Sequence, residues 1–256
     1  MEIVDVSQHG EASVLAALAV DDWPRYLVDV GAHDGQSLSN SFPFLSLGWA
    51  GVLVEPLPAA FERLAALHAD RPGVRCVQAA CGEREGRMPL SMGSDGPLPM
   101  TSRLGGDGGV EVSVRTLTSV LDEAGAPAEF SFLLVDAEGM DGSVLAGLDF
   151  DRFRPRVVVT EDAAPHLLEE RGYVLYAVVG AVNSIWIDRA LAETLGESLP
   201  LAPERMVERV GAAAWARRCA ELERSRDEIW QQLVVLQSSR SWRLTRPLRR
   251  LAQRRR

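Results

Sequence analysis

A short turn that contains two glycines follows the first apolar segment and offers the clearest chemistry in the sequence. It is formed by residues Asp29, Val30, Gly31, Ala32, His33, Asp34 and Gly35. Glycines at 31 and 35 allow the backbone to turn sharply and to approach a ligand. The G-x-G-x-x-G pattern of dinucleotide enzymes is absent, because His33 and Gln36 replace its second and third glycines. The turn therefore offers no obvious binding site for a pyrophosphate, whereas Asp29 suits a ligand with an ammonium group.

An acidic residue, Glu55, closes the second apolar run twenty residues after Gly35, and Pro56 follows it. A carboxylate at this point can accept hydrogen bonds from both hydroxyls of an unphosphorylated ribose. This feature disfavours NADP more firmly than NAD, and the missing second glycine disfavours an NAD-dependent sugar enzyme. The turn, Asp29 and Glu55 together predict a site for S-adenosylmethionine.

Further carboxylates follow the fourth and fifth apolar runs, at Asp136, Glu138, Glu161 and Asp162. Neighbouring parallel strands end at one edge of a sheet, so these groups should gather beside the ligand and raise each other's pKa. Three interpretations remain open. Asp136 or Glu138 could act as a general base on a hydroxyl group. Asp136, Glu161 and Asp162 could bind Mg²⁺, or Glu138 and Glu161 could only cap helices or bind loop amides.

Weaker candidates surround these carboxylates. His166 is a further possible base, since histidine titrates near neutrality, although such a residue is more often a solvated part of a first helical turn. Thr101, Ser102 and Arg103 could hydrogen-bond a polyol, and Asn183 could face the pocket.

The elements that must position these residues are short apolar runs that alternate with helix-like segments. Strands are predicted at 26–30, 51–55, 74–79, 130–136, 157–161, 174–179 and 184–187, and helices at 37–47, 58–69, 119–124, 142–148 and 165–171. The first five strands lack polar alternation, as strands buried on both faces of a parallel sheet do. The last two are too close for a crossover helix and should form an antiparallel hairpin. This pattern predicts an α/β, Rossmann-like class I methyltransferase fold, with a seven-stranded, mostly parallel sheet and an antiparallel last strand.

With these motifs in place, the sequence resembles the FkbM-type methyltransferases from about residue 26 to residue 189. The matching segments are VDVGAHDGQS, GWAGVLVEP, VQAACGEREG, VRTLTSVL and, most specific of all, FLLVDAEGMDGSVLAGLDFDRFRPRVVVTE. The resemblance implies O-methyl transfer from S-adenosylmethionine to a hydroxyl group of a sugar, glycan or secondary metabolite. It implies that the turn and Glu55 hold the cofactor, with Ala80 and Cys81 near the adenine. The predicted cofactor-binding residues are therefore Asp29, Gly31, Ala32, His33, Asp34, Gly35, Glu55, Pro56, Ala80, Cys81 and Asp136.

The sequence departs from the family pattern at several positions. The family usually has Asn where His33 stands and often Lys where Leu134 stands, and the acid after the Glu138-Gly139 pair is Asp141. His33 can alter how the turn meets the methionine end of the cofactor, although a surface-loop role is the simpler interpretation. The alternative to an enzyme is a non-catalytic binding module of a polysaccharide-assembly complex, which would keep Glu55 and tolerate loss of Asp136.

Two regions lie outside the regular alternation. Residues 86–112 are rich in glycine and proline, so they are expected to form a surface loop that is either disordered or a lid over the substrate. Residues 1–202 are predicted to form the methyltransferase domain. Residues 203–256 are predicted to form a helix with heptad spacing, a candidate homodimer contact, and a basic tail. The tail resembles extensions of bacterial glycosyltransferases and could contact an anionic membrane face or an acidic partner.

Composition limits the remaining function classes. The chain has 256 residues and a net charge of -9, yet the last 18 residues hold eight Arg and no acid. The acidic remainder would repel phosphate backbones, which argues against nucleic-acid binding. Three cysteines without metal-ligand spacing argue against a disulfide framework and a zinc site. The acidic N-terminus does not resemble a secretory signal, so a cytoplasmic location is expected, with the tail as a contact to the inner membrane face.

Overall fold

The computed structural model describes residues 3–19, 22–92, 102–104, 110–161, 165–180 and 182–196. Several predictions lie outside these ranges, namely those on Thr101, Asp162, the C-terminal helix and the basic tail. The side chains of Ser102 and Arg103 are outside the description as well. Within the described ranges, none of the helices combines the length and apolarity that crossing a membrane requires.

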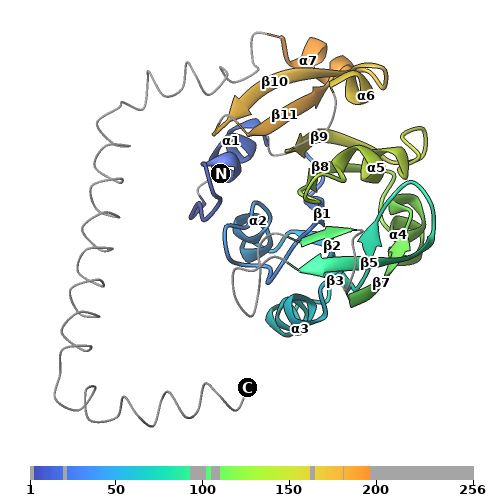
Figure 1. The fold of residues 1–256 in the computed structure, drawn as a ribbon. Helices are drawn as coiled ribbons and strands as arrows, with labels where there is room; N and C mark the ends of the chain where they lie inside the picture. Colours follow the sequence, from blue (N-terminus) through green and yellow to red (C-terminus); the bar gives the residue numbers. More distant parts are fainter. Residues whose placement is uncertain are drawn as a thin grey trace, which may run out of the picture. The chain divides into compact units, whose positions relative to one another are not determined.

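The centre of the fold is the predicted seven-stranded sheet (Figure 1). Its strands are β1 (Tyr26–Val30), β2 (Ala50–Val54), β3 (Val74–Val77), β8 (Glu129–Val135), β9 (Arg154–Thr160), β10 (Tyr173–Val179) and β11 (Asn183–Asp188). They are arranged in the order β10-β11-β9-β8-β1-β2-β3. β11 is antiparallel to both β9 and β10, whereas β3, β2, β1, β8 and β9 are parallel to one another. The predicted fold class, including the inserted antiparallel last strand, is confirmed.

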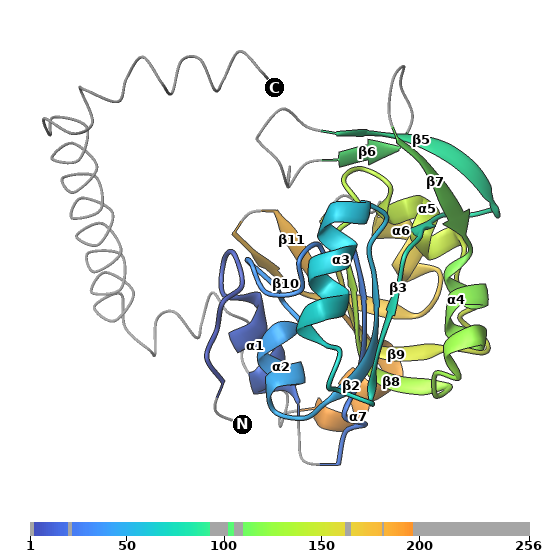
Figure 2. The same ribbon diagram turned by 90° about the horizontal axis from the view of Figure 1, so that it is seen from below.

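Helices cover both faces of this sheet, because its strands are apolar on both faces. α1 (Glu11–Leu18), α2 (Phe42–Ser46), α3 (Pro58–Leu67) and α7 (Arg189–Leu195) contact one face. α4 (Leu117–Ala124), α5 (Asp141–Ala146) and α6 (Pro165–Glu169) contact the other. Figure 2 shows α1 to α3 and α4 on opposite sides of the strands. Successive side chains of a strand point to opposite faces, so Leu27 joins the first layer and Val28 the second.

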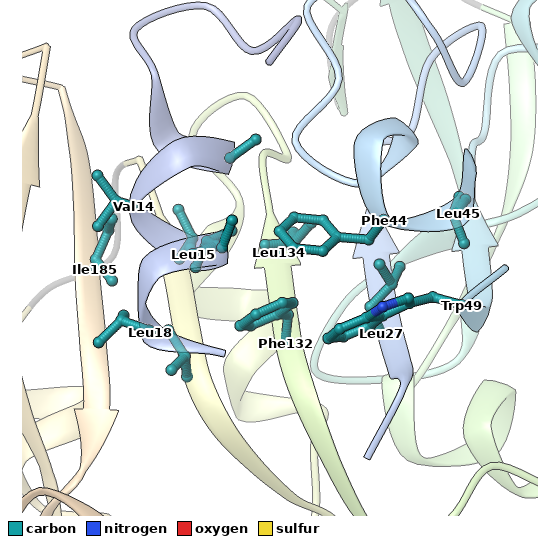
Figure 3. Close-up of a cluster of buried hydrophobic side chains, with 14 of the residues drawn as sticks. Val14, Leu15, Leu18, Leu27, Phe44, Leu45, Trp49, Phe132, Leu134 and Ile185 are labelled. Atoms are coloured by element: carbon teal, nitrogen blue, oxygen red, sulfur yellow. The ribbon is translucent and has the colours of Figure 1, made fainter. Parts of the chain in front are cut away.

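The core under α1 and α2 combines aliphatic side chains with a group of packed aromatic rings (Figure 3). Trp49 stacks on Phe132 with 5.3 Å between ring centroids, and Phe44 lies 5.0 Å from Phe132. Leu15 and Leu18 of α1 are fully buried beside these rings. α1 is thereby fixed to the sheet face beside β8, β9 and β11.

Part of the predicted loop at 86–112 is a second, smaller sheet, so the expectation of an unstructured loop is wrong for this part. Its strands are β4 (Ala80–Cys81), β5 (Gly86–Met92), β6 (Ser102–Leu104) and β7 (Val110–Arg115), in the order β4-β7-β5-β6. Among the described residues, Pro89 pairs with Glu111 of β7, and the pairing of β5 with β6 begins at Leu90. Proline is tolerated there because, within these ranges, the other side of β5 has no partner at that position. Leu90 and Val112 are buried against Leu57.

Candidate active site

A pocket opens at the edge of the main sheet where the parallel strands end. It is lined by residues that follow β1, β2, β3 and β8, by the first residue of β11, and by Gln8. The strand order places the lining residues in a row, namely Ala79, Glu55, Gly31, Asp136 and Asn183. β1 and β8 are neighbours in the sheet although far apart in the chain, which is the switch point where open α/β sheets bind ligands.

The glycine turn lies at this switch point. Gly31 has a φ of +92°, and a Cβ there would lie 2.0 Å from the Asp136 carbonyl oxygen. At Gly35, with a φ of +78°, a Cβ would lie 2.5 Å from Leu64. Both glycines are therefore required by close packing within the protein, in addition to any approach of a ligand. Gly31 and Ala32 line the pocket, whereas the Asp34 carboxylate faces its own loop and accepts hydrogen bonds from the amides of Gln36 and Ser37.

Glu55 lines the pocket from the end of β2 and is fixed by two backbone donors. Its Oε2 accepts a hydrogen bond from the His33 amide at 2.9 Å, and its Oε1 accepts one from the Leu57 amide at 2.7 Å. Each carboxylate oxygen keeps a further lone pair for a ligand hydroxyl. Burial raises the pKa of Glu55 to about 7, and the nearby Asp29 charge acts in the same direction. The side chain is thus oriented, as ribose recognition requires.

Asp29 lies within β1 and also lines the pocket. The Ser41 hydroxyl donates a hydrogen bond to its Oδ2 at 2.5 Å. The hydroxyl groups of Ser39 and Ser41 are hydrogen-bonded to each other at 3.1 Å. Burial raises the pKa of Asp29 to about 6. A cationic group bound nearby would favour the ionised form, which fits the predicted ammonium-bearing ligand.

Backbone strain in the described residues is concentrated at the pocket. The non-glycine residues with positive φ are His33, Leu38 and Glu138, at +49°, +54° and +48°, and all three line the pocket. The His33 side chain is 17% exposed and neither ring nitrogen has a hydrogen-bond partner, so its interpretation as a surface-loop histidine is wrong. Asn40 Oδ1 is another buried atom in this pocket without a partner. Unsatisfied polar atoms and strained residues are typical of a wall that is completed by a polar ligand.

An apolar wall lies at the β3 end of the pocket. It includes Ala79, Ala80, Cys81, Pro56 and Leu90. This composition fits the flat face of a purine, as predicted for Ala80 and Cys81. Burial raises the pKa of the Cys81 thiol to about 12, so the thiol packs against the site and does not act as a nucleophile.

The carboxylates after β8 and β9 converge, as predicted. Asp136 faces the open pocket, yet the pocket walls displace much of its surrounding water. This desolvation, together with the charge of Glu161 and a hydrogen bond to it, raises the pKa of Asp136 to about 8, and Glu138 and Asp141 add to the shift. Asp136 is therefore paired with Glu161 and keeps its own proton near neutral pH.

Asp141 is a site residue whose role sequence reasoning missed. It is 1% exposed, and its carboxylate accepts hydrogen bonds from the Ala137 amide at 2.9 Å and the Glu161 amide at 2.8 Å. One buried side chain thus ties the loop after β8 to the end of β9. Glu138 does not cap α5, whose N-cap is Met140 without a side-chain cap. Asp141 has a loop-amide role of the kind that was considered for Glu138 and Glu161.

Two other predictions receive no support from the geometry. His166 is exposed on α6 and does not line the pocket. Among the described residues, no group of three or more His, Cys, Asp or Glu side chains is arranged to hold a metal ion. The Mg²⁺ interpretation also involves Asp162, which lies outside the described residues. Asn183, in contrast, lines the pocket as predicted.

Comparison with known proteins identifies the family. The profile of the family described as "Methyltransferase FkbM domain" matches residues 29–183, more than half of the chain. No curated protein matches the sequence. The chain is similar to a precorrin-6y C5,15-methyltransferase from Geobacter metallireducens GS-15, at 16% identity and a TM-score of 0.37 over 69% of this chain and 84% of that one. It is also similar to a TehB-like SAM-dependent methyltransferase from Corynebacterium glutamicum, at 14% identity and a TM-score of 0.34 over 70% and 88%. By the family match, the chain belongs to the FkbM methyltransferase family and is an S-adenosylmethionine-dependent methyltransferase.

Proposed function

We propose that the protein methylates an oxygen atom, namely a hydroxyl group of a sugar, glycan or secondary metabolite. The observation that carries this proposal is the Asp136 carboxyl group, which lines the pocket beside the glycine turn and whose pKa is raised by burial and by Glu161. A hydroxyl must lose its proton as its oxygen becomes methylated, so O-methyl transfer requires a base next to the acceptor. A carboxyl group whose pKa lies near neutrality can take up that proton at working pH.

The pocket residues also fit the cofactor. Glu55 would accept hydrogen bonds from the two ribose hydroxyls, Asp29 would lie on the side of the amino group, and the wall at Ala80 and Cys81 would contact the adenine. S-adenosylmethionine, when bound, supplies an electrophilic methyl group on a positively charged sulfur. Asn40 Oδ1 and the His33 ring nitrogens, which are buried and have no hydrogen-bond partner, provide further polar contacts in the same cavity.

Asp136 and the pocket walls have separate roles in the proposed reaction. Bound S-adenosylmethionine would supply the methyl group to the acceptor oxygen, and the ionised carboxylate of Asp136 would take up the hydroxyl proton. The pocket would hold the acceptor oxygen in place and exclude water. Because the base must be ionised, the rate should rise with pH through the apparent pKa of Asp136. The positive charge of bound S-adenosylmethionine would lower that apparent pKa relative to its value in the cofactor-free protein.

Cofactor binding is the first test. Isothermal titration of S-adenosylmethionine and S-adenosylhomocysteine should show micromolar binding to the wild type and strong weakening in Glu55→Ala. Glu85→Ala is the matched control, since Glu85 is exposed and does not line the pocket. Mg²⁺ should change neither result, and a Mg²⁺ requirement would favour the metal interpretation. Absence of binding to the wild type would refute the proposed function.

The base is tested separately. Release of S-adenosylhomocysteine is measured against a panel of hydroxyl-bearing acceptors for the wild type, for Asp136→Asn, and for the exposed control Asp151→Asn. We expect Asp136→Asn to bind S-adenosylhomocysteine normally and to lose about 100-fold or more in turnover, as general bases contribute. An Asp136→Asn protein that turns over like the wild type would exclude Asp136 as the base.

Contacts beyond the pocket remain proposals. The predicted homodimer helix and the basic tail lie outside the described residues, as noted above. We infer from their sequence alone that the helix could pair two copies and that the tail could contact an anionic surface. Analytical ultracentrifugation of the full chain at two salt concentrations would test the first idea, and sedimentation with anionic vesicles the second.

A further inference from the structure

The segment that precedes α1 forms part of the pocket wall and lies outside the residues that match the family. We call residues 5–10 the N-terminal arm. α1, which follows the arm, is held by the buried side chains Leu15 and Leu18 against the sheet face beside β11 (Figure 3). The C-terminal end of the arm is therefore held by a fixed helix, and its residue Gln8 lies in the pocket wall.

Buried polar contacts hold the arm against the β10–β11 hairpin. Glu11 is fully buried, and its carboxylate accepts hydrogen bonds from the His9 amide at 2.9 Å and from Asn183 Nδ2 at 2.6 Å. His9 lies so close to Gly180 that a Cβ on this glycine would come within 2.3 Å of the imidazole. Asp5 accepts hydrogen bonds from the amides of Ser7 and Ser13 at 2.9 and 2.8 Å and closes the arm on itself. The arm and the hairpin are thus one surface.

The order of the strands tells which end of the pocket this surface serves. Glu55, at the end of β2, marks the ribose side, and Asp136, at the end of β8, marks the side of the base. β9 and β11 lie beyond β8, so Asn183 lies on the far side of Asp136 from Glu55. Gln8 belongs to the arm that Glu11 joins to Asn183. Gln8 and Asn183 therefore lie at the acceptor end of the pocket.

The side chains on this surface suit hydroxyl groups. A carboxamide both donates and accepts hydrogen bonds, as a hydroxyl group does. The Gln8 side chain is exposed in the pocket wall, and Asn183 uses Nδ2 for Glu11, which orients its Oδ1. Asp136 and Glu138 also line the pocket and would repel an anionic acceptor.

We propose that the N-terminal arm completes an acceptor subsite in which Gln8 and Asn183 bind the hydroxyl groups of an uncharged polyhydroxylated acceptor. This inference rests on the proposed function, because it takes the β8–β11 end of the pocket as the acceptor side. It assigns the arm, with Glu11 as its positioning residue, a role in acceptor selection. It also names the acceptor class as neutral polyols, in preference to phosphorylated or carboxylated compounds.

Saturation-transfer NMR on the full chain loaded with S-adenosylhomocysteine tests the subsite. The probes are methyl α-glucopyranoside and methyl α-rhamnopyranoside, which are neutral, and methyl glucuronoside, which is anionic. We expect the neutral probes to bind with millimolar dissociation constants and the anionic probe to bind more weakly. Gln8→Ala should weaken the neutral probes about 2- to 10-fold, the effect of losing one hydrogen bond, and should leave binding of S-adenosylhomocysteine unchanged.

A control variant and a second subsite variant are compared with Gln8→Ala. Gln36→Ala removes another exposed glutamine that does not line the pocket, and it should bind the probes like the wild type. Asn183→Ala should also weaken the neutral probes, and its melting temperature shows whether loss of the Glu11 contact has disturbed the fold. Gln8→Ala, whose side chain is exposed, decides the matter if Asn183→Ala unfolds.

The outcomes separate this inference from the proposed function. Wild type that binds S-adenosylhomocysteine but neither neutral probe overturns the subsite alone. Equal binding of the neutral probes by Gln8→Ala and wild type, or equal binding of the neutral and anionic probes, also overturns it. Wild type that fails to bind S-adenosylhomocysteine overturns the proposed function and the subsite together.

Discussion

Replacing Glu55 by glutamine should change the free energy of unfolding by an amount that depends on pH. The Glu55 residue is 6% exposed, and burial raises its pKa from 4.5 to about 7. The unfolded chain releases this proton near pH 4.5, whereas the folded chain keeps it until about pH 7. Glu55 therefore contributes stability that is fully present below pH 4.5 and is lost as the pH rises through 7.

The size of the effect follows from the shift. One pKa unit corresponds to about 1.4 kcal/mol, so wild type should lose about 2–3 kcal/mol between pH 5 and pH 8 through this group. Glutamine does not titrate. At pH 5 the variant should be less stable than wild type by about 1–3 kcal/mol, because its NH₂ group opposes one of the two backbone donors, His33 or Leu57. By pH 8 this deficit should have disappeared.

Urea unfolding of the cofactor-free protein, followed by tryptophan fluorescence at pH 5, 6, 7 and 8, measures the difference. Asp136 also has a raised pKa, but it titrates in both proteins and cancels in the comparison. The charge of Asp29 helps to raise the pKa of Glu55, so the interaction between these two groups is part of the measured difference. Glu85→Gln, at an exposed position, provides the control. A difference between wild type and Glu55→Gln that stays constant from pH 5 to pH 8 would show that Glu55 is ionised throughout and would refute the reasoning.

Three further predictions concern single positions. Asp141→Asn should lower the free energy of unfolding by about 2–4 kcal/mol in urea titrations, because a buried acceptor of two amides is replaced by a group that also donates. Gly31→Ala should cost more than about 3 kcal/mol, and Gly86→Ala, in open space, less than about 1 kcal/mol. With Cys76 and Cys219 replaced by serine, Cys81 should react with Ellman's reagent at pH 8 at least about tenfold faster in urea than in the folded protein.

The sheet and the cofactor half of the site could be predicted from the sequence because they depend on local patterns. Apolar runs without polar alternation identify buried parallel strands, and a short spacer identifies the final hairpin. Glu55 and Asp29 have fixed places relative to these strands, so their positions followed once the strands were recognised. The turn glycines were also recognised, although part of their reason is the approach of the Asp136 carbonyl to Gly31.

The remaining features depend on contacts between distant parts of the chain. The apolar helix α1 and the arm before it carry no motif, and Gln8 lies at the pocket because contacts such as that of Glu11 with Asn183 hold the arm there. Asp141 resembles an ordinary first-turn acid until β8 and β9 are placed side by side. The glycine and proline content of residues 86–112 predicted a loop, so the strands β5 and β7 were not predicted. These strands form because they pair with each other on both sides of Pro89.

The residues with positive φ show how the fold connects the two sides of the pocket. His33 and Leu38 belong to the loop after β1, and Glu138 belongs to the loop after β8, so the strain lies on both sides of the switch point. A left-handed residue costs about 1–2 kcal/mol, and three of them at one pocket persist only because the surrounding structure holds them. Glu55 accepts a hydrogen bond from the His33 amide, and Asp141 accepts one from the Ala137 amide beside Glu138. Each buried carboxylate thus stabilises a strained loop next to it, which is why the two acids that orient the pocket are also expected to control its stability.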